Sequence, residues 1–563
     1  MQLNRIDAET FSKMFLNGAK RLESKKDIIN ELNVFPVPDG DTGTNMNLTI
    51  QSAVNEVNNI TELNMQVLAK SISSGSLRGA RGNSGVILSQ LLRGFTKVIR
   101  DEEEITIELF SAAMQKAVET AYKAVMKPKE GTILTVARGA AEHANEIVGQ
   151  VDNFDDYFKS IIEHAEKVLQ ETPEMLPVLK EAGVVDSGGQ GLLEILKGGY
   201  AYYSGEDVDT LFASEASSDA SDKETAKSVI GYATSFVINK STDKSTDSLL
   251  MFYETIADNV IVTELDGIIK VTAFSNDPGR MLTKAISFGS VDEIKISPCT
   301  EVPEMKACEE CKADEEEVKA EAEVTCEEPK EDKVEPIKEK KEPSKEMGFV
   351  AVSVGEGMNE IFKGLGVDSI ITGGQTMNPS TDDVLNAIDN VDAKTVFVLP
   401  NNKNIILAAN QAQYLVEDKQ VIVIPTKTIP QGITALISYM SDNTPEENEK
   451  LMNEEIAKVK TGQVTFAVRD TVINGMEIHQ GNIMGIGDHD ILAVGTVVED
   501  TTMKMLESMV DEDSELICIY YGDEVDEEIA NDLASSIEEK YPDCDVEIHL
   551  GGQPIYYYIV SVE

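Results

Sequence analysis

The sequence predicts a multidomain chain with three folded units: an all-α domain, a small α+β domain and an α/β domain. Residues 106–126 and 155–169 place apolar side chains three and four positions apart, which is the period of a helix. Short β-rich runs begin at residue 228, and strand-like and helix-like segments alternate from residue 347 onward. A length of 563 residues is enough for three to five domains of about 100–200 residues each.

Changes in composition mark the boundaries between these units. Gly, Pro and Ser connect the predicted helices of residues 1–205, and residues 206–227 have the Ser-, Ala- and Asp-rich composition of a linker. The middle domain is expected over residues 228–298. Residues 299–346 hold 18 acidic and 9 basic residues and few large apolar ones, which is typical of a disordered linker. The α/β domain then occupies residues 347–563.

Sequence patterns also place the elements that follow residue 227. In the middle domain we expect strands at residues 229–239, 248–254, 259–264, 268–275 and 291–296, and a helix at residues 280–288. In the α/β domain we expect strands at residues 349–354, 369–372, 395–399 and 421–424, and helices at residues 358–365, 382–388 and 403–415. This alternation is typical of a parallel sheet. Residues 514–563 again read as strand, helix and strand.

The composition is strongly acidic, with 49 Lys and Arg against 100 Asp and Glu and a net charge of −51. Nucleic acids and anionic lipid surfaces attract basic patches, so this balance argues against proteins that bind either of them. No run of apolar residues in the sequence is long enough to span a membrane, and the polar residues 1–10 lead us to expect no signal peptide. Its six cysteines do not form a disulfide framework. We therefore expect a soluble cytoplasmic protein.

The motif with the most chemical content is Asn-Val-Phe-Pro-Val-Pro-Asp-Gly-Asp-Thr-Gly-Thr-Asn-Met at residues 33–46. Asp39 and Asp41 flank one glycine, and such a pair can converge on a divalent cation that offsets the repulsion between the carboxylates. Mg²⁺ suits this arrangement, because it takes one or two carboxylates and leaves other positions to water and phosphate oxygens. A turn that caps the following helix is the structural alternative.

A second glycine-rich segment, Ser-Ser-Gly-Ser-Leu-Arg-Gly-Ala-Arg-Gly-Asn-Ser-Gly at residues 73–85, runs into an apolar helix. Amides near its end could hold phosphate oxygens. Arg78 and Arg81 either add positive charge there or lie on the surface. The segment is not a Walker A loop, because no Gly-Lys-Ser/Thr ends it.

Two shorter segments are Gly-Thr-Ile-Leu-Thr at residues 131–135 and Gly-Val-Val-Asp-Ser-Gly-Gly-Gln-Gly at residues 183–191. Each by itself is weak evidence, because glycine-rich turns usually only connect helices. Four such segments in one helical domain predict that they gather at one end of a helix bundle.

These segments resemble, in order and spacing, the nucleotide-binding (L) domain of dihydroxyacetone kinases and, more closely, the ATP-binding subunit of the bacterial fatty acid kinase. The resemblance extends to Gly-Val-Asp-Ser-Ile-Ile-Thr-Gly-Gly-Gln-Thr-Met-Asn-Pro-Ser-Thr at residues 366–381 and to Gly-Gly-Gln-Pro-Ile-Tyr-Tyr-Tyr at residues 551–558. It covers the chain except the insert at residues 299–346. It implies a barrel of antiparallel helices that holds ATP and two Mg²⁺ ions at one end.

The resemblance also implies roles for individual residues. Asp39 and Asp41 would bind Mg²⁺ and be essential for catalysis. Asn33 lies one position from where dihydroxyacetone kinases carry a third Asp, and would be a further metal ligand. The residues expected to contact ATP are Thr42, Gly43, Thr44, Asn45, Asn83, Ser84 and Gly85 near the phosphates, and Thr132, Asp186 and Gly188 near the nucleoside.

In this family a separate lipid-binding protein presents the carboxylate of a fatty acid. Transfer of the γ-phosphoryl group of ATP then gives an acyl phosphate for phospholipid synthesis. A carboxylate is already ionised at neutral pH, so the reaction needs no general base. The resemblance further implies a homodimer, and a C-terminal domain with the fold of the lipid-binding partner that docks this partner or forms the dimer.

The middle domain departs from the family. Family members often carry one Cys and two His there, which suit a metal site, whereas this chain has Ala233, Thr272 and Phe274. We therefore predict no metal at that place. The insert could instead bind zinc through Cys299, Cys308, Cys311 and Cys326, and the alternative is a tether with reduced thiols.

Three alternatives stay open from the residues alone. The segment at residues 373–380 is either a ligand loop or a strand-to-helix turn that Ser380 or Thr381 caps. The chain could phosphorylate dihydroxyacetone or a similar small molecule, although no domain with a substrate-binding histidine is evident. It could also be a non-enzymatic regulator that binds nucleotide, although the intact pair Asp39 and Asp41 argues against this. The five histidines, which lie outside the four segments, are expected to be structural or to face solvent.

Overall fold

The computed structural model describes residues 5–34, 40–125, 127–205, 231–242, 246, 249–250, 253, 257–265, 267–275, 278–299, 343–374, 378–467, 471–473, 476–488 and 490–563. The chain divides into two compact units, one of residues 1–221 and 344–563 and one of residues 222–343. Most residues of the two predicted linkers lie outside the described residues, so the predicted domain boundaries stay predictions. Among the described residues, every helix is too short or too polar to cross a lipid bilayer.

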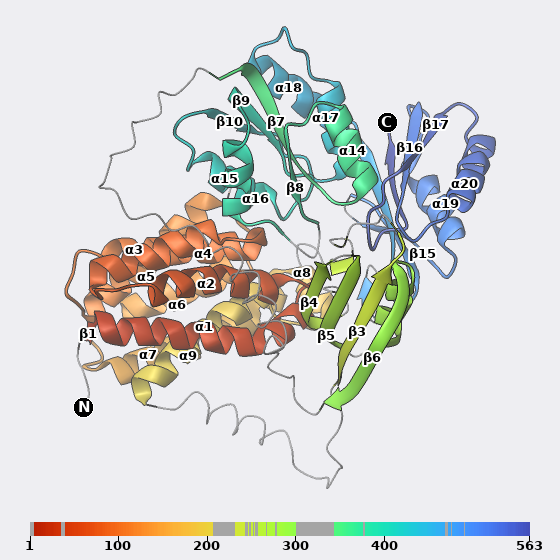
Figure 1. The fold of residues 1–563 in the computed structure, drawn as a ribbon. Helices are drawn as coiled ribbons and strands as arrows, with labels where there is room; N and C mark the ends of the chain where they lie inside the picture. The colour runs from red at the N-terminus through yellow and green to blue at the C-terminus, as the bar shows by residue number, and fades with distance from the viewer. Residues whose placement is uncertain are drawn as a thin grey trace, which may run out of the picture. The chain divides into compact units, whose positions relative to one another are not determined.

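The described part of residues 5–205 is almost entirely helical, as predicted (Figure 1). Its helices are α1 (Ala8–Glu31), α2 (Thr42–Asn58), α3 (Met65–Arg78), α4 (Gly82–Ile99), α5 (Ile107–Ala124), α6 (Ile133–Glu146), α7 (Phe154–Met175), α8 (Pro177–Ala182) and α9 (Ser187–Ser204). A two-residue antiparallel ladder joins β1 (Ile6–Asp7) to β2 (Glu104–Ile105).

Short polar side chains define where many of these helices begin. The cap residue of five helices accepts a hydrogen bond from the backbone N–H three residues later, which satisfies a donor that the helix itself leaves without a partner. These caps are Asp7 for α1, Asn64 for α3, Thr106 for α5, Asn153 for α7 and Asp186 for α9.

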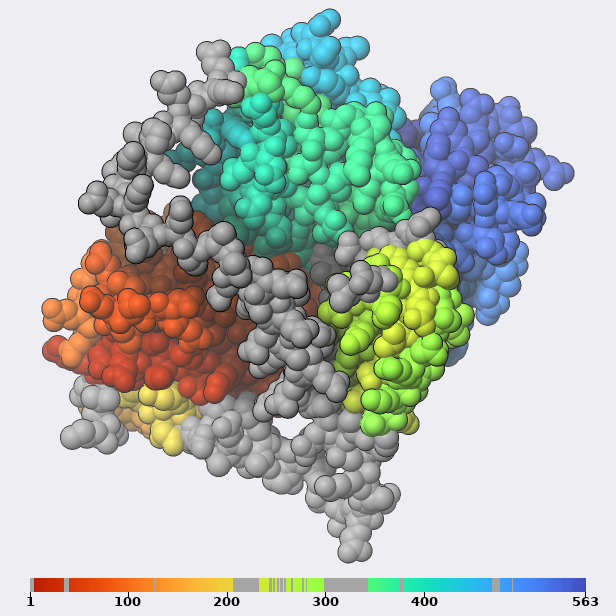
Figure 2. Space-filling view, viewed as in Figure 1, coloured from red at the N-terminus to blue at the C-terminus, as the bar shows by residue number. Residues whose placement is uncertain are grey.

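Successive long helices run antiparallel, and each packs against its neighbours in the chain. Helix α9 returns to pack against α1, so the helix contacts close into a ring. In the space-filling view, the side chains of the first helices form a closely packed surface, coloured red and orange (Figure 2). Because successive helices run antiparallel, every second loop between the long helices lies at the same end of this domain.

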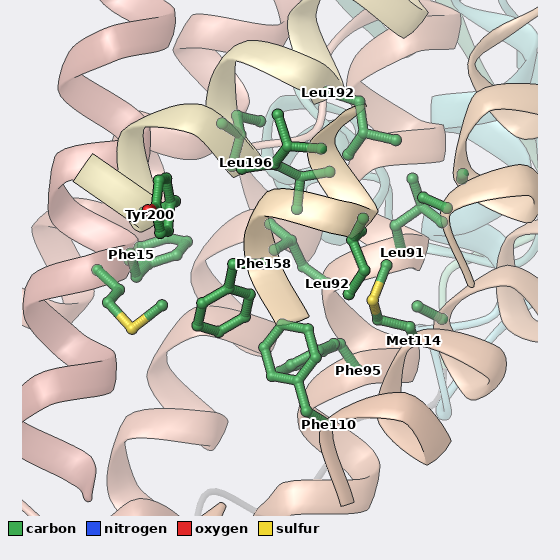
Figure 3. Close-up of a pocket in the computed structure, with 18 of the residues that line it drawn as sticks. Phe15, Leu91, Leu92, Phe95, Phe110, Met114, Phe158, Leu192, Leu196 and Tyr200 are labelled. Carbon is green, nitrogen blue, oxygen red and sulfur yellow. The ribbon is translucent and has the colours of Figure 1, made fainter. Parts of the chain in front are cut away.

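The interior of the helical domain contains an apolar cavity of about 160 Å³. Side chains from α1, α4, α5, α6, α7 and α9 line it, and Phe95, Phe110 and Phe158 turn toward one another within it (Figure 3). The Phe110 ring meets those of Phe95 and Phe158 edge to face, with centroids 5.1 Å apart in both pairs. Aromatic side chains thus hold α4, α5 and α7 together across the interior.

The second unit contains an antiparallel sheet with the strand order β4-β5-β3-β6. Its elements are β3 (Gly231–Lys240), β4 (Asp258–Leu265), β5 (Ile268–Ser275), α12 (Pro278–Ile286) and β6 (Gly289–Cys299). This confirms the predicted α+β pattern there, except for the strand expected at residues 248–254. The described residues of that stretch, including Leu249 and Tyr253, are helical. These two side chains lie one turn apart and are buried in one apolar core, which explains why a helix forms there.

The register of β3 and β5 brings together Ala233, Thr272 and Phe274, the three positions at which the sequence predicts no metal site. Ala233 pairs directly with Phe274, and Thr272 lies two residues away on the same strand. Side chains two residues apart on a strand share a face, so the three positions are neighbours on the sheet. Here they carry a methyl group, a phenyl ring and a hydroxyl group.

The C-terminal part begins with a parallel sheet of order β10-β9-β7-β8, which confirms the predicted alternation. Its elements are β7 (Lys345–Ser353), α14 (Glu356–Gly364), β8 (Ser369–Thr372), α15 (Thr381–Asp389), β9 (Ala393–Leu399), α16 (Ile406–Gln413), β10 (Gln420–Val423), α17 (Ile429–Ile437) and α18 (Pro445–Ile456). Each predicted strand and helix up to residue 424 has a counterpart in this list.

A second, mixed sheet follows, with the order β15-β14-β11-β18-β16-β17. Its elements are β11 (Lys460–Phe466), β14 (Ile483–Ile486), β15 (Ile491–Gly495), α19 (Val498–Met509), β16 (Leu516–Tyr521), α20 (Glu527–Lys540), β17 (Asp545–Leu550) and β18 (Tyr558–Val562). Strands β12 (Thr471–Ile473) and β13 (Met476–Ile478) form a separate ribbon. The parallel pair β16 and β17, joined through α20, is the strand–helix–strand unit predicted near the C-terminus.

Candidate functional site

The described residues of the four glycine-rich segments lie at one end of the helical domain. The first precedes α2, the second connects α3 to α4, the third precedes α6 and the fourth precedes α9. Because successive long helices are antiparallel, the starts of these four helices share the end at which α1, α3, α5 and α7 finish. Helix starts present N–H groups without intrahelical partners, which suits an anionic ligand. The predicted gathering of the segments is therefore confirmed.

Helix α2 begins in close contact with the end of α1. A Cβ atom added to Gly43 would lie 2.1 Å from the carbonyl oxygen of Lys26, so the approach of the two helices requires glycine. The Asn30 side chain accepts a hydrogen bond from the Thr44 N–H at 3.1 Å and donates one to the Thr44 hydroxyl at 2.9 Å. Sequence reasoning missed Asn30, which lies just outside the motif.

Two of the metal ligands predicted from the sequence, Asn33 and Asp41, lie near this helix start. Asn33 is 2% exposed, and its Oδ1 accepts a hydrogen bond from the Thr42 hydroxyl. Asp41 is the residue that precedes α2, is 9% exposed and does not cap the helix with its side chain. The Asp41 carboxylate thus does not have the helix-capping role that the structural alternative would give it. Asp39 lies outside the described residues.

Helix α4 begins directly beside α2. Gly82 has a φ of +57°, and a Cβ added there would meet the Asn45 side chain at 2.6 Å. The Arg81 N–H donates to the Thr49 hydroxyl at 3.2 Å. The predicted residues Asn45 on α2 and Asn83 to Gly85 on α4 are therefore brought together. The Gly85 N–H donates to the Arg81 carbonyl at 3.1 Å, which is the first bond of the helix.

The third and fourth segments meet through Asp186. Its carboxylate accepts hydrogen bonds from the Gly189 N–H at 2.7 Å and from the backbone of Ile133, so it bridges the starts of α9 and α6. Burial raises the pKa of Asp186 to about 7, against the opposing effect of these two bonds. Gly188 lies against Ile133, beside the predicted residue Thr132 that precedes α6. Met46 on α2 contacts Gly191 on α9, and this contact connects the first glycine-rich segment with the fourth.

Residues of the C-terminal part contact the candidate site from outside the helical domain. Helices α15 and α16 pack on α3 and α4. The Asn378 side-chain amide donates to Asp41 Oδ2 at 2.7 Å, and the Asn83 amide donates to Asn404 Oδ1 at 2.9 Å. Sequence reasoning missed both partners, although Asn378 lies in a segment that it singled out.

Arg81 is directed at the same C-terminal segment. Its guanidinium donates to the Asn378 carbonyl at 2.9 Å and lies 3.7 Å from the Asp383 carboxylate. Arg78, in contrast, is exposed. Ser380 caps α15 and shares a capping box with Asp383, which confirms that residues 378–381 lead into a capped helix.

The oxygen donors present fit Mg²⁺ better than a softer metal. Asp41 offers a carboxylate, Asn33 and Asn378 offer carboxamide oxygens, and Thr42 offers a hydroxyl group, which are hard ligands. The described residues contain no group of three or more His, Cys, Asp or Glu side chains that could hold a metal. Cys308, Cys311, Cys326 and the side chain of Cys299 lie outside what the structure describes, so zinc finds no support there.

The described histidines do not lie in the four segments. His143 stacks on His164 with ring centroids 4.3 Å apart, on α6 and α7. His143 Nε2 also lies 2.8 Å from the Ser160 hydroxyl, and burial lowers the pKa of His164. His549 stacks on Tyr520 in the C-terminal sheet. These contacts fit the structural role predicted for them, and His489 lies outside the described residues.

Sequence models of three protein families match the chain. A DAK2 domain matches residues 36–201, the middle domain of FakA-like fatty acid kinase proteins matches residues 229–302, and their C-terminal domain matches residues 348–563. Protein YloV of Bacillus subtilis is 41% identical over the full length of both chains. An uncharacterized protein of Staphylococcus epidermidis is 39% identical and one of Staphylococcus aureus 40% identical, again over the full length of both chains.

Several solved structures match parts of the chain. Dihydroxyacetone kinase from C. freundii, in complex with AMP-PNP and Mg²⁺, is 15% identical and covers 33% of each chain, with a TM-score of 0.27. The Streptococcus pneumoniae Fatty Acid Kinase (Fak) B3 protein, loaded with linoleic acid, is 12% identical. It matches over 39% of this chain and 99% of its own, with a TM-score of 0.27.

Proposed function

Because the chain belongs to the FakA-like family of fatty acid kinase proteins, we propose that it transfers the γ-phosphoryl group of ATP to a fatty acid held by a separate lipid-binding protein. The observation that carries this proposal is the convergence of four helix starts, with Asp41, Asn33 and Thr42, at one end of the helical domain. The product is an acyl phosphate. The predicted homodimer and cytoplasmic location stay predictions.

In the proposed reaction a fatty acid carboxylate oxygen attacks the γ-phosphorus of ATP. A new P–O bond forms, the bond between the γ-phosphorus and its bridging oxygen breaks, and ADP leaves with the bond electrons. The carboxylate is ionised at neutral pH, so no side chain has to remove a proton. The protein contributes by positioning the reactants and by stabilising negative charge.

The backbone amides at the starts of α2 and α4 supply part of that charge stabilisation. The Gly85 N–H already donates to the Arg81 carbonyl, and the Thr44 N–H already donates to the Asn30 side chain. We therefore propose that the residues just before Gly85 and Thr44 make most of the backbone contacts with phosphate. On α2 these are Thr42 and Gly43, and on α4 they are Asn83 and Ser84. Local amide donors matter in this chain because its net charge of −51 repels ATP at longer range.

Asp41, together with Asp39 and Asn33, would hold Mg²⁺, which neutralises phosphate charge when it is bound. Asp41 is positioned for this by its place before α2 and by the hydrogen bond from Asn378. Asp186 is held between two helix starts, so in this proposal it shapes the nucleoside side of the site and does not bind metal.

The proposal is tested by mixing the full chain with ATP, Mg²⁺ and a lipid-binding protein that co-purifies with it and carries a fatty acid. Acyl phosphate, trapped with hydroxylamine, should form only when all components are present. ATP bound without turnover in the presence of the loaded partner would instead support the nucleotide-binding regulator. Turnover with dihydroxyacetone in place of the loaded partner would support the small-molecule kinase.

A further inference from the structure

Asn378 has a buried side chain whose amide nitrogen forms a hydrogen bond and whose amide oxygen forms none with the described residues. It lies between β8 and α15, is 2% exposed and donates through Nδ2 to Asp41 Oδ2 at 2.7 Å. Its Oδ1 has no hydrogen-bond partner among the residues that the structure describes. Buried polar atoms are nearly always paired, and an exception needs an explanation, such as an ion.

The backbone from Asn378 to Thr381 is firmly held. The Arg81 guanidinium donates to the Asn378 carbonyl at 2.9 Å, and the Thr381 N–H donates to the Ala80 carbonyl at 3.1 Å. Ser380 between them caps α15. Asn378 is therefore fixed against the candidate site by contacts that its own side chain does not make.

An acceptor oxygen beside a carboxylate is electrostatically unfavourable unless a positive charge lies near both. Carboxylate and carboxamide oxygens are both suitable ligands for Mg²⁺. We propose that Asn378 supplies an oxygen ligand, from the C-terminal part of the chain, to the divalent cation held at Asp41. This inference rests on the proposed function, because the cation is the one that accompanies ATP.

In this arrangement one side chain has two tasks. Its amide nitrogen orients Asp41, and its oxygen completes the coordination of the cation. Asp41 and Asn378 are 337 residues apart, so the metal site forms only when the C-terminal part packs on the helical domain. The C-terminal part is then a component of the kinase site, in addition to any role in docking a partner.

A purely structural role in the contact between the two parts is the competing explanation, and Gln411 provides a matched control. Gln411 is also buried, its amide nitrogen donates to the Leu77 carbonyl at 2.7 Å, and it lies 3.0 Å from the Gln90 side chain. Gln411→Ala removes contacts between the same two parts, whereas none of its described hydrogen bonds involves Asp41.

The test is a titration of Mn²⁺, followed by electron paramagnetic resonance, into the full-length chain saturated with AMP-PNP. Asn378→Ala should weaken Mn²⁺ binding by about tenfold or more, as loss of groups around a metal usually does. Gln411→Ala should leave the Mn²⁺ affinity at the wild-type value. The measurement needs no fatty acid and no partner protein, so it is independent of phosphoryl transfer.

Asn378→Asp distinguishes a ligand from a hydrogen-bond donor. It keeps an oxygen but removes the N–H group and adds a negative charge beside Asp41. If the oxygen binds the cation, Asn378→Asp should bind Mn²⁺ at least as tightly as wild type. Its melting temperature should be below that of wild type in EDTA and recover when Mn²⁺ and AMP-PNP are added.

Wild-type Mn²⁺ affinity in Asn378→Ala would overturn the inference and leave the proposed function intact. Equal weakening by Asn378→Ala and Gln411→Ala would overturn it in favour of a structural contact. Should Asn378→Ala not fold, Asn378→Asp decides: no recovery of its stability with Mn²⁺ would also overturn the inference. A wild-type chain that takes up no Mn²⁺ with AMP-PNP would overturn the proposed function itself.

Discussion

Arg21 on α1 donates through Nε to Glu194 Oε2 on α9 at 2.6 Å, in an ion pair whose side chains are only 6–7% exposed. The Gln190 amide donates to the other carboxylate oxygen at 2.7 Å. The pair joins the first and last helices of the ring, where α1 and α9 pack together. It therefore ties the two ends of the helical sequence at the point where the ring of helix contacts closes.

Removal of one partner from this ion pair should be costly, because it leaves the other charge buried. Glu194→Ala is expected to lower the free energy of unfolding by about 3–5 kcal/mol, measured by urea denaturation. Glu104→Ala breaks the exposed ion pair with Arg5 and should have a far smaller effect. Equal effects of the two substitutions would mean that the buried pair has no special importance for stability.

Loss of the Asp41 carboxylate should abolish phosphoryl transfer without loss of the fold. Asp41→Ala is expected to reduce kcat by more than about 100-fold, because charge on the phosphates is no longer neutralised at the right place. Circular dichroism should be unchanged. Asp101→Ala alters an exposed carboxylate at the opposite end of the helices and should leave kcat unchanged. Full activity of Asp41→Ala would show that Asp41 is not a metal ligand.

Asp186 should make the stability of the chain depend on pH. Its pKa of about 7 lies above the value in an unfolded chain, so between roughly pH 4 and pH 7 the folded state binds more protons than the unfolded state. The stability that Asp186 contributes is thus present at low pH and declines as pH rises to about 7.

Asp186→Asn keeps an oxygen for the Gly189 N–H and cannot ionise. From pH 5 to pH 8, wild type should lose stability relative to Asp186→Asn by a few kcal/mol, measured by urea denaturation at both values. A difference between the two proteins that stays constant with pH would mean that the pKa of Asp186 is not raised.

Phe110 should be among the side chains most important for packing in the helical domain. Its ring contacts those of Phe95, Phe154, Tyr157 and Phe158. Because it borders a cavity that already exists, Phe110→Ala would enlarge an apolar void and should cost about 3–5 kcal/mol in urea denaturation.

Tyr414 is 85% exposed and provides the aromatic control, since Tyr414→Ala should change stability by less than about 0.5 kcal/mol. A Phe110→Ala protein as stable as the Tyr414→Ala protein would indicate that the surrounding rings collapse into the space.

Local patterns were sufficient to predict much of the fold. Apolar spacing placed α5 and α7, because a period of three to four residues reflects one buried helix face. Alternation of strand-like and helix-like segments placed the parallel sheet that begins with β7, whose strands are buried over most of their length. The strand predicted at residues 248–254 was wrong. A short apolar run is compatible with either structure, and the burial of Leu249 and Tyr253 on one side favoured the helix.

The sequence by itself determined the family, the four glycine-rich segments and the candidate residues Asp41, Thr42 and Asn83, because these signals lie in short contiguous motifs. Only the tertiary structure decided that Asn30 occupies the Thr44 amide and that Asp186 bridges two helix starts. It alone brought Asn378 to Asp41. Contacts of this kind join residues far apart in the chain, and they depend on how helices and sheets pack, which no local pattern encodes.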